Sequence, residues 1–246
     1  MHWIDKNQKD IIVTNTKKNN SIDNNKKKEE AEEEDFVVVE EEIETANLSS
    51  MNRVESIGYL PKLNGESSMI EEGDIISFIS KLPPRYSTSD WNLLYSTLKH
   101  GISINTFYSR VVGKGPTVLL IEDSKHYVFG AFISDSWRND TSSYYGTGES
   151  FLFSLKPIFK VYKWTSLNNY FVLSTGHSIS IGGGGSFGIW INKDFTEGSS
   201  NTCTTFNNPT LSSDQIFKCN HIEVWGLDSN DTPVSSNQFV NKYNIH

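Results

Sequence analysis

Seven short segments rich in β-branched and aromatic residues fill the second half of the chain, and they constrain its fold more than any other feature. Clusters of turn residues separate them, at 117–122, 126–133, 150–155, 157–164, 169–174, 187–191 and 217–227. Segments of this composition and length are typical of β-strands. Several are apolar at both odd and even positions, which indicates strands covered on both faces. We therefore expect a mainly β fold, a β-sandwich of two stacked antiparallel sheets.

Apolar residues recur at helical spacing in three segments before residue 117. They predict a short helix within 71–82, a second helix over 90–101 and a third over 103–113. The second has the strongest local signals, since a Thr-Ser-Asp run before it offers capping oxygens and a glycine ends it. Its apolar face would carry Trp91, Leu94, Tyr95 and Leu98. The helices from residue 90 onward would flank the two sheets and close one side of them.

The first third of the chain is acidic and poor in aromatic residues. The net charge of the whole chain is −8, and runs such as KKKEEAEEED at 26–35 place most of it before residue 89. Such a stretch cannot bury enough apolar surface to offset the entropy of ordering it. We therefore expect a disordered, acidic, Asn/Lys/Glu-rich arm over 1–70, a short helix or linker over 71–82, one folded domain over 83–228 and a polar tail over 229–246.

Charge and hydropathy exclude several classes of protein. An acidic chain with no basic stripe lacks the Lys and Arg with which nucleic-acid binders neutralise phosphates, so no nucleic acid is expected as a partner. No apolar run approaches the roughly 20 residues that span a bilayer, and the opening MHWIDKNQKD has no hydrophobic segment typical of a signal peptide. We expect a cytoplasmic protein with no integral membrane segment, and a mitochondrial or nuclear pool stays open.

Three residues of the last expected strand are the first candidates for chemistry. His221, Glu223 and Trp225 alternate along the strand, so their side chains share one face. A His-x-Glu pair on a strand would supply two ligands of an iron(II) site if another histidine arrived from elsewhere. The candidates for that further ligand are His100, His126 and His177. The simpler interpretation is a surface face of the last strand, and no metal site is predicted.

Two cysteines and one glutamate are further candidates. Cys203 and Cys219 have no CxxC spacing, which predicts neither a zinc site nor a redox motif and leaves two free thiols, either of which could be oxidisable. Glu149 follows a glycine turn and could act as a general acid or base if His177 lay nearby. The simpler interpretation is that Glu149 accepts backbone N–H bonds of a neighbouring loop.

The glycine run IGGGGSFGIW at 181–190 permits two interpretations. Consecutive glycines could let backbone N–H groups approach a phosphate. However, no Lys-Ser/Thr pair and no helix start follow the run, because Phe187, Ile189 and Ile191 continue as a strand. Structural glycines, at a bulge or at a close contact between sheets, are therefore favoured. No cofactor site is predicted.

No catalytic centre is recognisable in the chain, so a protein without enzymatic activity is expected. The alternative is an enzyme, either a thiol-based peroxide scavenger using Cys203 or Cys219, or a metal-dependent enzyme using His221 and Glu223. A third possibility is a carbohydrate-binding face of aromatic side chains. It would require that several tryptophans lie exposed on one side, among Trp91, Trp137, Trp164, Trp190 and Trp225.

The order of the sequence blocks resembles one known family. The blocks are LPPRYSTSDWNLLYSTLKHGISINTFY (82–108), VLLIED, VFGAF, YYGTGESFLFSLKP, VYKWTSLNNYF, ISIGGGGSFGIWINKDFTEGSSNTCTTFNN and FKCNHIEVWGLD. In this order they closely resemble the TLDc domain of the oxidation-resistance protein family, over residues 83–228. The resemblance implies a β-sandwich flanked by helices, and protection against oxidative stress without an established catalytic centre.

The same resemblance implies a mode of action and a set of positions. It implies binding to the cytosolic catalytic sector of the vacuolar proton-pumping ATPase and regulation of its assembly, so that subunits of this sector are the implied partners. The residues on family signature positions are carried over as scaffold or partner-binding candidates: Gly146, Gly148, Glu149, Gly182, Gly183, Gly184, Gly188, Trp190 and Trp225. Loops over 134–149 and 193–215 are expected to take part, because loops held by a rigid scaffold commonly carry recognition.

Overall fold

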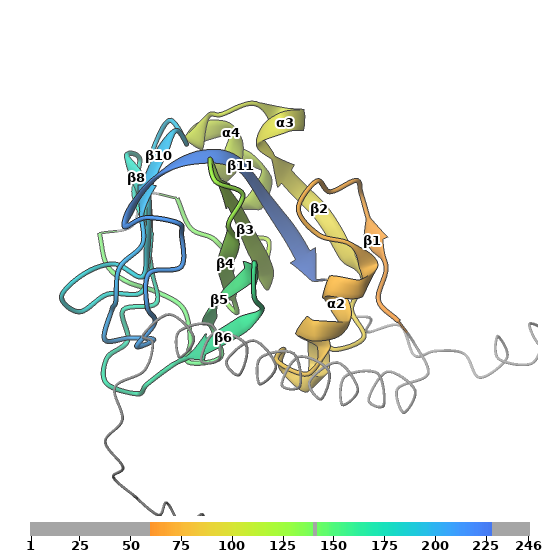
Figure 1. Cartoon of the computed structure of the whole chain (residues 1–246), viewed down its shortest axis with the longest axis horizontal. Coiled ribbons are helices and arrows are strands. Elements are labelled where there is room, and N and C mark those ends of the chain that lie inside the picture. Colours follow the sequence, from red (N-terminus) through yellow and green to blue (C-terminus); the bar gives the residue numbers. More distant parts are fainter. Residues whose placement is uncertain (1–59, 140–141, 228–246) are drawn as a thin grey trace, which may run out of the picture. The chain divides into compact units, whose positions relative to one another are not determined.

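A computed structural model describes residues 60–139 and 142–227, and most of the predicted arm and the predicted tail lie outside these residues (Figure 1). The helices are α2 Glu72–Ile79, the 3₁₀ helix η1 Pro84–Tyr86, α3 Thr97–His100 and α4 Ile104–Val111. The strands are β1 Leu63–Asn64, β2 Trp91–Ser96, β3 Thr117–Asp123, β4 Val128–Ile133, β5 Phe151–Lys156, β6 Lys160–Lys163, β7 Val172–Ser174, β8 Ser178–Ile181, β9 Ile189–Asn192, β10 Glu197–Ser199 and β11 Ile216–Leu227. The fold is therefore mainly β with a few short helices, as the sequence predicts.

The strands form one large sheet, in which all pairs are antiparallel except β1 with β2. The order along the sheet is β6-β5-β4-β3-β11-β10-β9-β8-β7, and β2 pairs with β11 as well. The sequence predicts two separate sheets, whereas the structure joins them. The reason is the length of β11, which pairs through residues 216–218 with β10 and through residues 219–226 with β3 (Figure 1). One long strand thus belongs to both arms of the sheet.

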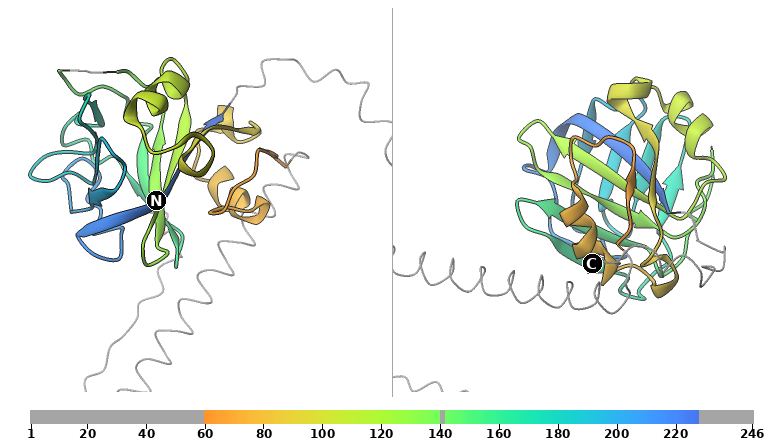
Figure 2. Two further views of the ribbon diagram at one scale, coloured as in Figure 1. Left: turned by 90° about the horizontal axis from the view of Figure 1, so that it is seen from above. Right: turned by 90° about the vertical axis from the view of Figure 1, so that its right-hand side faces the viewer.

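The two arms of the sheet enclose a shared hydrophobic core. Figure 2 shows the strands β3 to β6 in the middle, with β7 to β10 on one side of them and the N-terminal segment on the other. The buried cluster between the arms is drawn from β3, β4, β8, β9 and α4, and it includes Leu119, Ile121, Phe129, Ile179, Ile181, Ile189, Ile191 and Phe107. Burial against this core accounts for the apolar residues at every second position of β3 and β4, such as Leu119, Ile121 and Phe129.

A second hydrophobic cluster lies on the other face of β3, β4 and β5, under α2. Phe78 of α2 is fully buried there, and its ring lies 4.8 Å from the ring of Phe153. The helix predicted within 71–82 is therefore present, with its apolar side packed on the sheet. Met69 and Ile70 are buried in the same cluster, so the last residues of the predicted arm belong to the packed part of the chain.

The helix predicted over 90–101 is wrong for most of its length. Residues 91–96 form β2, which pairs with β11 and β1, and only Thr97–His100 are helical. The spacing of Trp91 and Tyr95 is compatible with a helix and with a regular strand, because positions four residues apart share a face in both. In β2, however, an irregularity in the pairing with β11 places Tyr95 in the core between the arms and Trp91 in the cluster under α2. The hydrogen-bonding partners offered by β11, far away in sequence, decide in favour of the strand.

The helix predicted over 103–113 is confirmed as α4, and Ser103 caps it by accepting the N–H of Thr106 at its hydroxyl oxygen. The seven predicted strand segments are confirmed as well, whereas β1, β2, β8 and β10 are additional. A tight turn after Asp123 joins β3 and β4. Its carboxylate accepts the N–H of Lys125 at 2.9 Å and that of Tyr127 at 3.1 Å, which stabilises the turn.

Candidate functional site

One loop crosses the open side of the folded sheet. Residues 164–171, which we call the seam loop, connect β6 to β7, the two ends of the strand order. The rings of Trp164 and Phe171 lie 5.5 Å apart, and Trp164 Nε1 donates to the Asn168 carbonyl oxygen at 2.7 Å. The seam loop therefore bridges the two arms of the sheet at the place where strand pairing stops.

Three other loops pack on the seam loop and bring most of the signature glycines to it. Gly148 lies directly against Trp164. A Cβ at this position would fall 2.2 Å from the indole ring, so the close approach requires glycine. The signature glycines at this junction are Gly146, Gly148, Gly182, Gly183 and Gly184. We call residues 144–149, 164–171, 182–185 and 202–207 together the loop face.

Side-chain hydrogen bonds hold the loop face together. Asn168 Nδ2 donates to Thr204 Oγ1 at 2.7 Å, and Thr205 Oγ1 donates to Asn168 Oδ1 at 2.7 Å. Gly183 N donates to Thr205 Oγ1 at 2.9 Å. The N–H group of Gly183 is therefore used within the fold instead of pointing at a site for an anion. A network of this kind fixes the loops that it connects.

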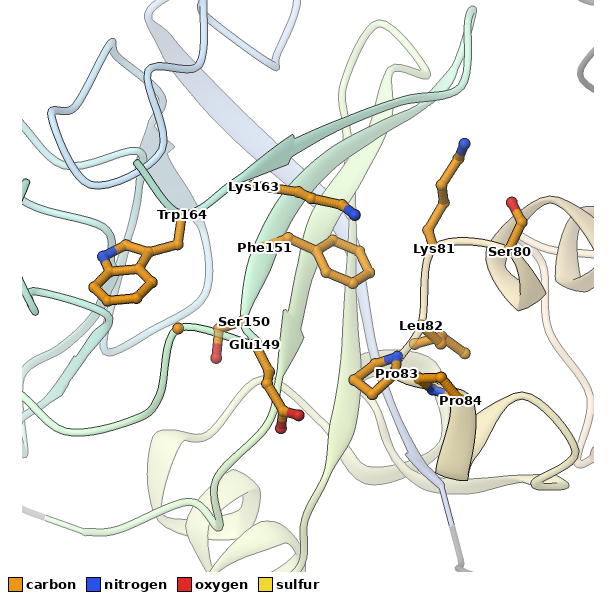
Figure 3. A pocket seen from close by; sticks show the side chains of 11 residues that line it. Ser80, Lys81, Leu82, Pro83, Pro84, Glu149, Ser150, Phe151, Lys163 and Trp164 are labelled. Carbon is orange, nitrogen blue, oxygen red and sulfur yellow. The ribbon is translucent and has the colours of Figure 1, made fainter. Parts of the chain in front are cut away.

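Two hollows flank the seam loop. The first, of about 440 Å³, lies between residues 80–84 and 148–151 and also borders Lys163 and Trp164 (Figure 3). The second, of about 310 Å³, is lined by Thr165, Leu167, Gly184, Thr202, Cys203, Thr204 and Asn207. The seam loop exposes two apolar side chains, Leu167 at 75% and Tyr170 at 45%. The loop face thus combines a fixed backbone with exposed apolar groups.

Glu149 sits at the rim of the first hollow and forms an ion pair with Arg85. Arg85 Nη1 donates to Glu149 Oε1 at 2.6 Å, and Nη2 donates to Oε2. The partner that the structure shows for this carboxylate is the guanidinium of Arg85 in η1, from another part of the chain, where the sequence suggests loop N–H groups. The hydrogen bonds from Arg85 lower the pKa of Glu149, since burial opposes them only in part. An ionised carboxylate at neutral pH is unsuited to the role of general acid.

The face of β11 that carries His221, Glu223 and Trp225 is buried, contrary to the surface face that the sequence predicts. The segment 67–70 covers Glu223, and the side chains of Ser96 and Thr97 contact His221. His221 Nε2 lies 3.0 Å from Glu223 Oε1, and Glu223 Oε2 accepts Trp225 Nε1 at 3.0 Å and Ser67 Oγ at 2.7 Å. This buried polar network fastens the segment before α2 to the central strand.

A metal site at His221 and Glu223 finds no support in the described part of the chain. Within residues 60–139 and 142–227, no three or more His, Cys, Asp or Glu side chains are grouped so that they could hold a metal ion. The neighbours of His221 are hydroxyl groups and one carboxylate, with Thr97 Oγ1 at 2.6 Å from its Nδ1. The pair serves as a hydrogen-bonding element of the core.

Both cysteines are free, and Cys203 is buried whereas Cys219 is partly buried. Cys203 is buried behind the second hollow and donates its S–H to Asn208 Oδ1 at 3.1 Å, and burial raises the pKa of its thiol. Burial also raises the pKa of Cys219, to about 12. Because the thiolate is the reactive form, both environments oppose the chemistry of a peroxide scavenger.

We expect both thiols to be alkylated by iodoacetamide at least about tenfold more slowly in the folded protein at neutral pH than in the protein unfolded in urea, because burial hinders access and thiolate formation. Mass spectrometry of peptides containing Cys203 or Cys219 measures this directly. A thiol that reacts in native buffer as fast as free cysteine would restore the scavenger as a candidate function.

Comparison with known proteins identifies the family of this chain. Residues 63–228 match the TLDc domain family. The chain belongs to the TLDc domain family. Its relatives include nuclear receptor coactivator 7 of Homo sapiens, 40% identical over 171 residues, or 69% of this chain and 18% of that protein. Oxidation resistance protein 1 of Xenopus tropicalis is 38% identical over 179 residues, 72% of this chain and 20% of that protein.

A second human relative matches a longer part of the chain. Oxidation resistance protein 1 of Homo sapiens is 36% identical over 191 residues, 76% of this chain and 22% of that protein. The chain thus spans about a fifth of the length of these relatives, as the shares of 18%, 20% and 22% show. The family match begins 20 residues before the start expected at residue 83, and it includes α2 and β1. In the described residues, no helix is long and apolar enough to cross a membrane.

The signature positions of this TLDc domain do not gather in a single place. Five glycines and Glu149 belong to the loop face, whereas Gly188 is buried beside Leu152 and Cys203. Trp190 lies half-buried on β9, and Trp225 is fully buried in the cluster under α2. Trp91 and Trp137 are buried too, so an exposed row of tryptophans for carbohydrate is contradicted.

Three residues that shape or flank the loop face of the TLDc domain are not predicted from the sequence. Arg85, Asn168 and Leu167 were not candidates. One signal was available for Leu167, because WTSLNNYF places an apolar residue among polar ones in a loop. No signal connects Arg85 with Glu149, since 64 positions separate the ion-pair partners along the chain.

Proposed function

We propose that this TLDc domain acts without catalysis, as a protein-interaction module in resistance to oxidative stress. It binds the cytosolic catalytic sector of the vacuolar proton-pumping ATPase and regulates the assembly of the pump, and it does so in the cytoplasm. Membership of the TLDc family and the similarity to proteins named oxidation resistance protein 1 support the stress role. The observation that carries the interaction role is the loop face, with Leu167 exposed on a hydrogen-bonded support.

The physical argument for the loop face rests on entropy and on apolar area. A loop fixed before binding loses little conformational freedom on association, so more of its contact energy appears as affinity. Leu167 and Tyr170 supply apolar contact area, and the second hollow beside Leu167 offers room for a partner side chain. A partner that docks here needs no nucleophile and no cofactor.

We expect Leu167→Asp to weaken binding of the full chain to the purified cytosolic sector of the pump at least about tenfold, because a charge would replace an apolar contact at the centre of the interface. Ile216→Asp is the matched control, since both side chains are 75% exposed and Ile216 starts β11 away from the loop face. Surface-immobilised binding measurements with both variants, each checked by circular dichroism, provide the comparison.

The stress role has its own readout. In cells that lack the protein, the wild-type chain and Ile216→Asp should restore survival in hydrogen peroxide, and Leu167→Asp should not. Folded wild-type protein that does not bind the pump sector refutes the proposed partner. Equal loss of binding in both variants refutes the assignment to the loop face.

A further inference from the structure

One edge of the sheet lacks a neighbouring strand in the part of the chain that the structure describes. β6 is the last strand of the order, and β5 is its only partner in residues 60–139 and 142–227. The strand at the opposite end, β7, has an additional bridge, from Val172 to Tyr145. In an antiparallel pair, alternate residues direct their N–H and C=O groups away from the neighbour. β6 therefore presents backbone groups to which a further strand can bind.

The side chains of β6 alternate between two environments. Lys163 is paired with Phe151, whose ring belongs to the cluster under α2, so Lys163 projects on that side and borders the first hollow (Figure 3). Lys160 and Tyr162 lie on the opposite face, where Lys160 Nζ is 5.9 Å from the centre of the Tyr162 ring. The strand thus carries an exposed lysine at each end, one on each face, with the half-buried Val161 and Tyr162 between them.

The electrostatic setting of this edge favours an acidic ligand. Lys160 and Lys163 are exposed. Lys156 at the end of β5 and Lys81 across the first hollow are exposed as well. None of the four lies in a salt bridge with a carboxylate of the described residues, and Glu149 at the same hollow is bound by Arg85. Lysines on an edge strand discourage pairing with neutral or basic strands. They attract a strand of opposite charge by the same interaction.

We infer that the free edge of β6 binds an extended acidic segment of a partner protein as an additional strand. The residues of the added strand that lie directly opposite Lys160 and Lys163 are three positions apart. The two residues between them face Val161 and Tyr162. The ligand is therefore a segment of the pattern acid, apolar, apolar, acid. Main-chain hydrogen bonds provide affinity and the lysine positions provide selectivity. This surface is separate from Leu167 and does not depend on the pump as a partner.

A labelled synthetic peptide with a Glu-Val-Val-Glu core tests the inference with the full chain, by fluorescence anisotropy at about 0.1 M salt, where the Debye length is about 10 Å. We expect Lys160→Glu with Lys163→Glu to weaken binding of this peptide at least about tenfold, because attraction becomes repulsion at two positions. The double variant Lys114→Glu with Lys193→Glu has the same change in net charge at two other exposed lysines. It should bind within about twofold of the wild type, because charges beyond the Debye length are screened.

Strand addition is distinguished from simple charge attraction by two further measurements. A peptide of the same sequence with N-methylated amides at alternate positions on the pairing edge should lose binding, since it cannot donate the ladder hydrogen bonds. Hydrogen exchange should show slower exchange of amides within residues 160–163 when the unmodified peptide is bound. Undiminished binding of the methylated peptide, unchanged exchange in β6, equal loss in both double variants, or no binding at all each overturns the inference.

Discussion

Replacing Glu223 by alanine is expected to lower the free energy of unfolding by about 3–5 kcal/mol, because it leaves several buried hydrogen-bonding groups without a partner, at a cost of about 1–3 kcal/mol each. Its carboxylate accepts Trp225 Nε1 at 3.0 Å and Ser67 Oγ at 2.7 Å, and it lies 3.0 Å from His221 Nε2. His221 and Glu223 are 3% and 1% exposed, so water cannot replace the lost partner without opening the core. Urea denaturation followed by tryptophan fluorescence measures the change.

Two controls separate this effect from the general cost of removing a carboxylate. Asp214→Ala removes one side of the exposed pair with Lys125, and it should change stability by less than about 1 kcal/mol. Glu223→Gln keeps the size of the side chain and should be less destabilising than Glu223→Ala. A loss for Glu223→Ala no larger than that for Asp214→Ala would contradict the structural role of the network.

The carboxyl group of Glu223 is expected to make the free energy of unfolding fall as the pH is lowered. Burial raises the pKa of Glu223, but the hydrogen bonds from His221, Ser67 and Trp225 outweigh burial, so that the pKa lies below its ordinary value. A carboxyl with a lowered pKa in the folded state stabilises fully above its unfolded pKa, and the stabilisation is lost as the pH falls toward the folded value. Wild-type stability should therefore fall on acidification below the ordinary range of Glu. Glu223→Gln should remove part of this fall.

Gly130→Ala is expected to destabilise the protein by about 3 kcal/mol, the upper end of the usual cost of overpacking a core. Gly130 lies in the middle of β4, opposite Leu120 of β3. A Cβ at this position would fall 1.8 Å from the carbonyl oxygen of Leu119, which is a backbone atom held within the sheet. The strands must separate or shift to admit one methyl group.

The matched control for Gly130 is the same substitution in α2. Nothing lies within 4 Å of a Cβ built at Gly73, and alanine favours a helix over glycine by up to about 1 kcal/mol. Gly73→Ala should therefore be neutral or stabilising, whereas Gly130→Ala lowers the melting temperature. Differential scanning calorimetry of both variants gives the comparison. Equal effects would show that the close approach of β3 and β4 imposes no packing restraint at Gly130.

Local sequence was sufficient to predict the secondary structure of short segments in which apolar side chains dominate. The segments around Leu119, Phe129 and Phe153 are strands because their apolar residues have two faces to cover. Local sequence was insufficient at Trp91 and Tyr95, whose spacing satisfies a helix and a strand equally. It was also insufficient at His221 and Glu223, because alternation shows that they share a face but not what covers it.

The sequence by itself determined the family, the mainly β composition and the helix after Ser103, because these depend on residues close together in the chain. Only the tertiary structure decided that one strand, β11, joins both arms, and that Ser67 and Arg85 reach Glu223 and Glu149. It also decided that Leu167 is exposed while Trp225 is buried. Burial and ion pairing depend on residues that are distant in sequence. Only folding of the whole domain, which closes the long loops between them, brings these residues into contact.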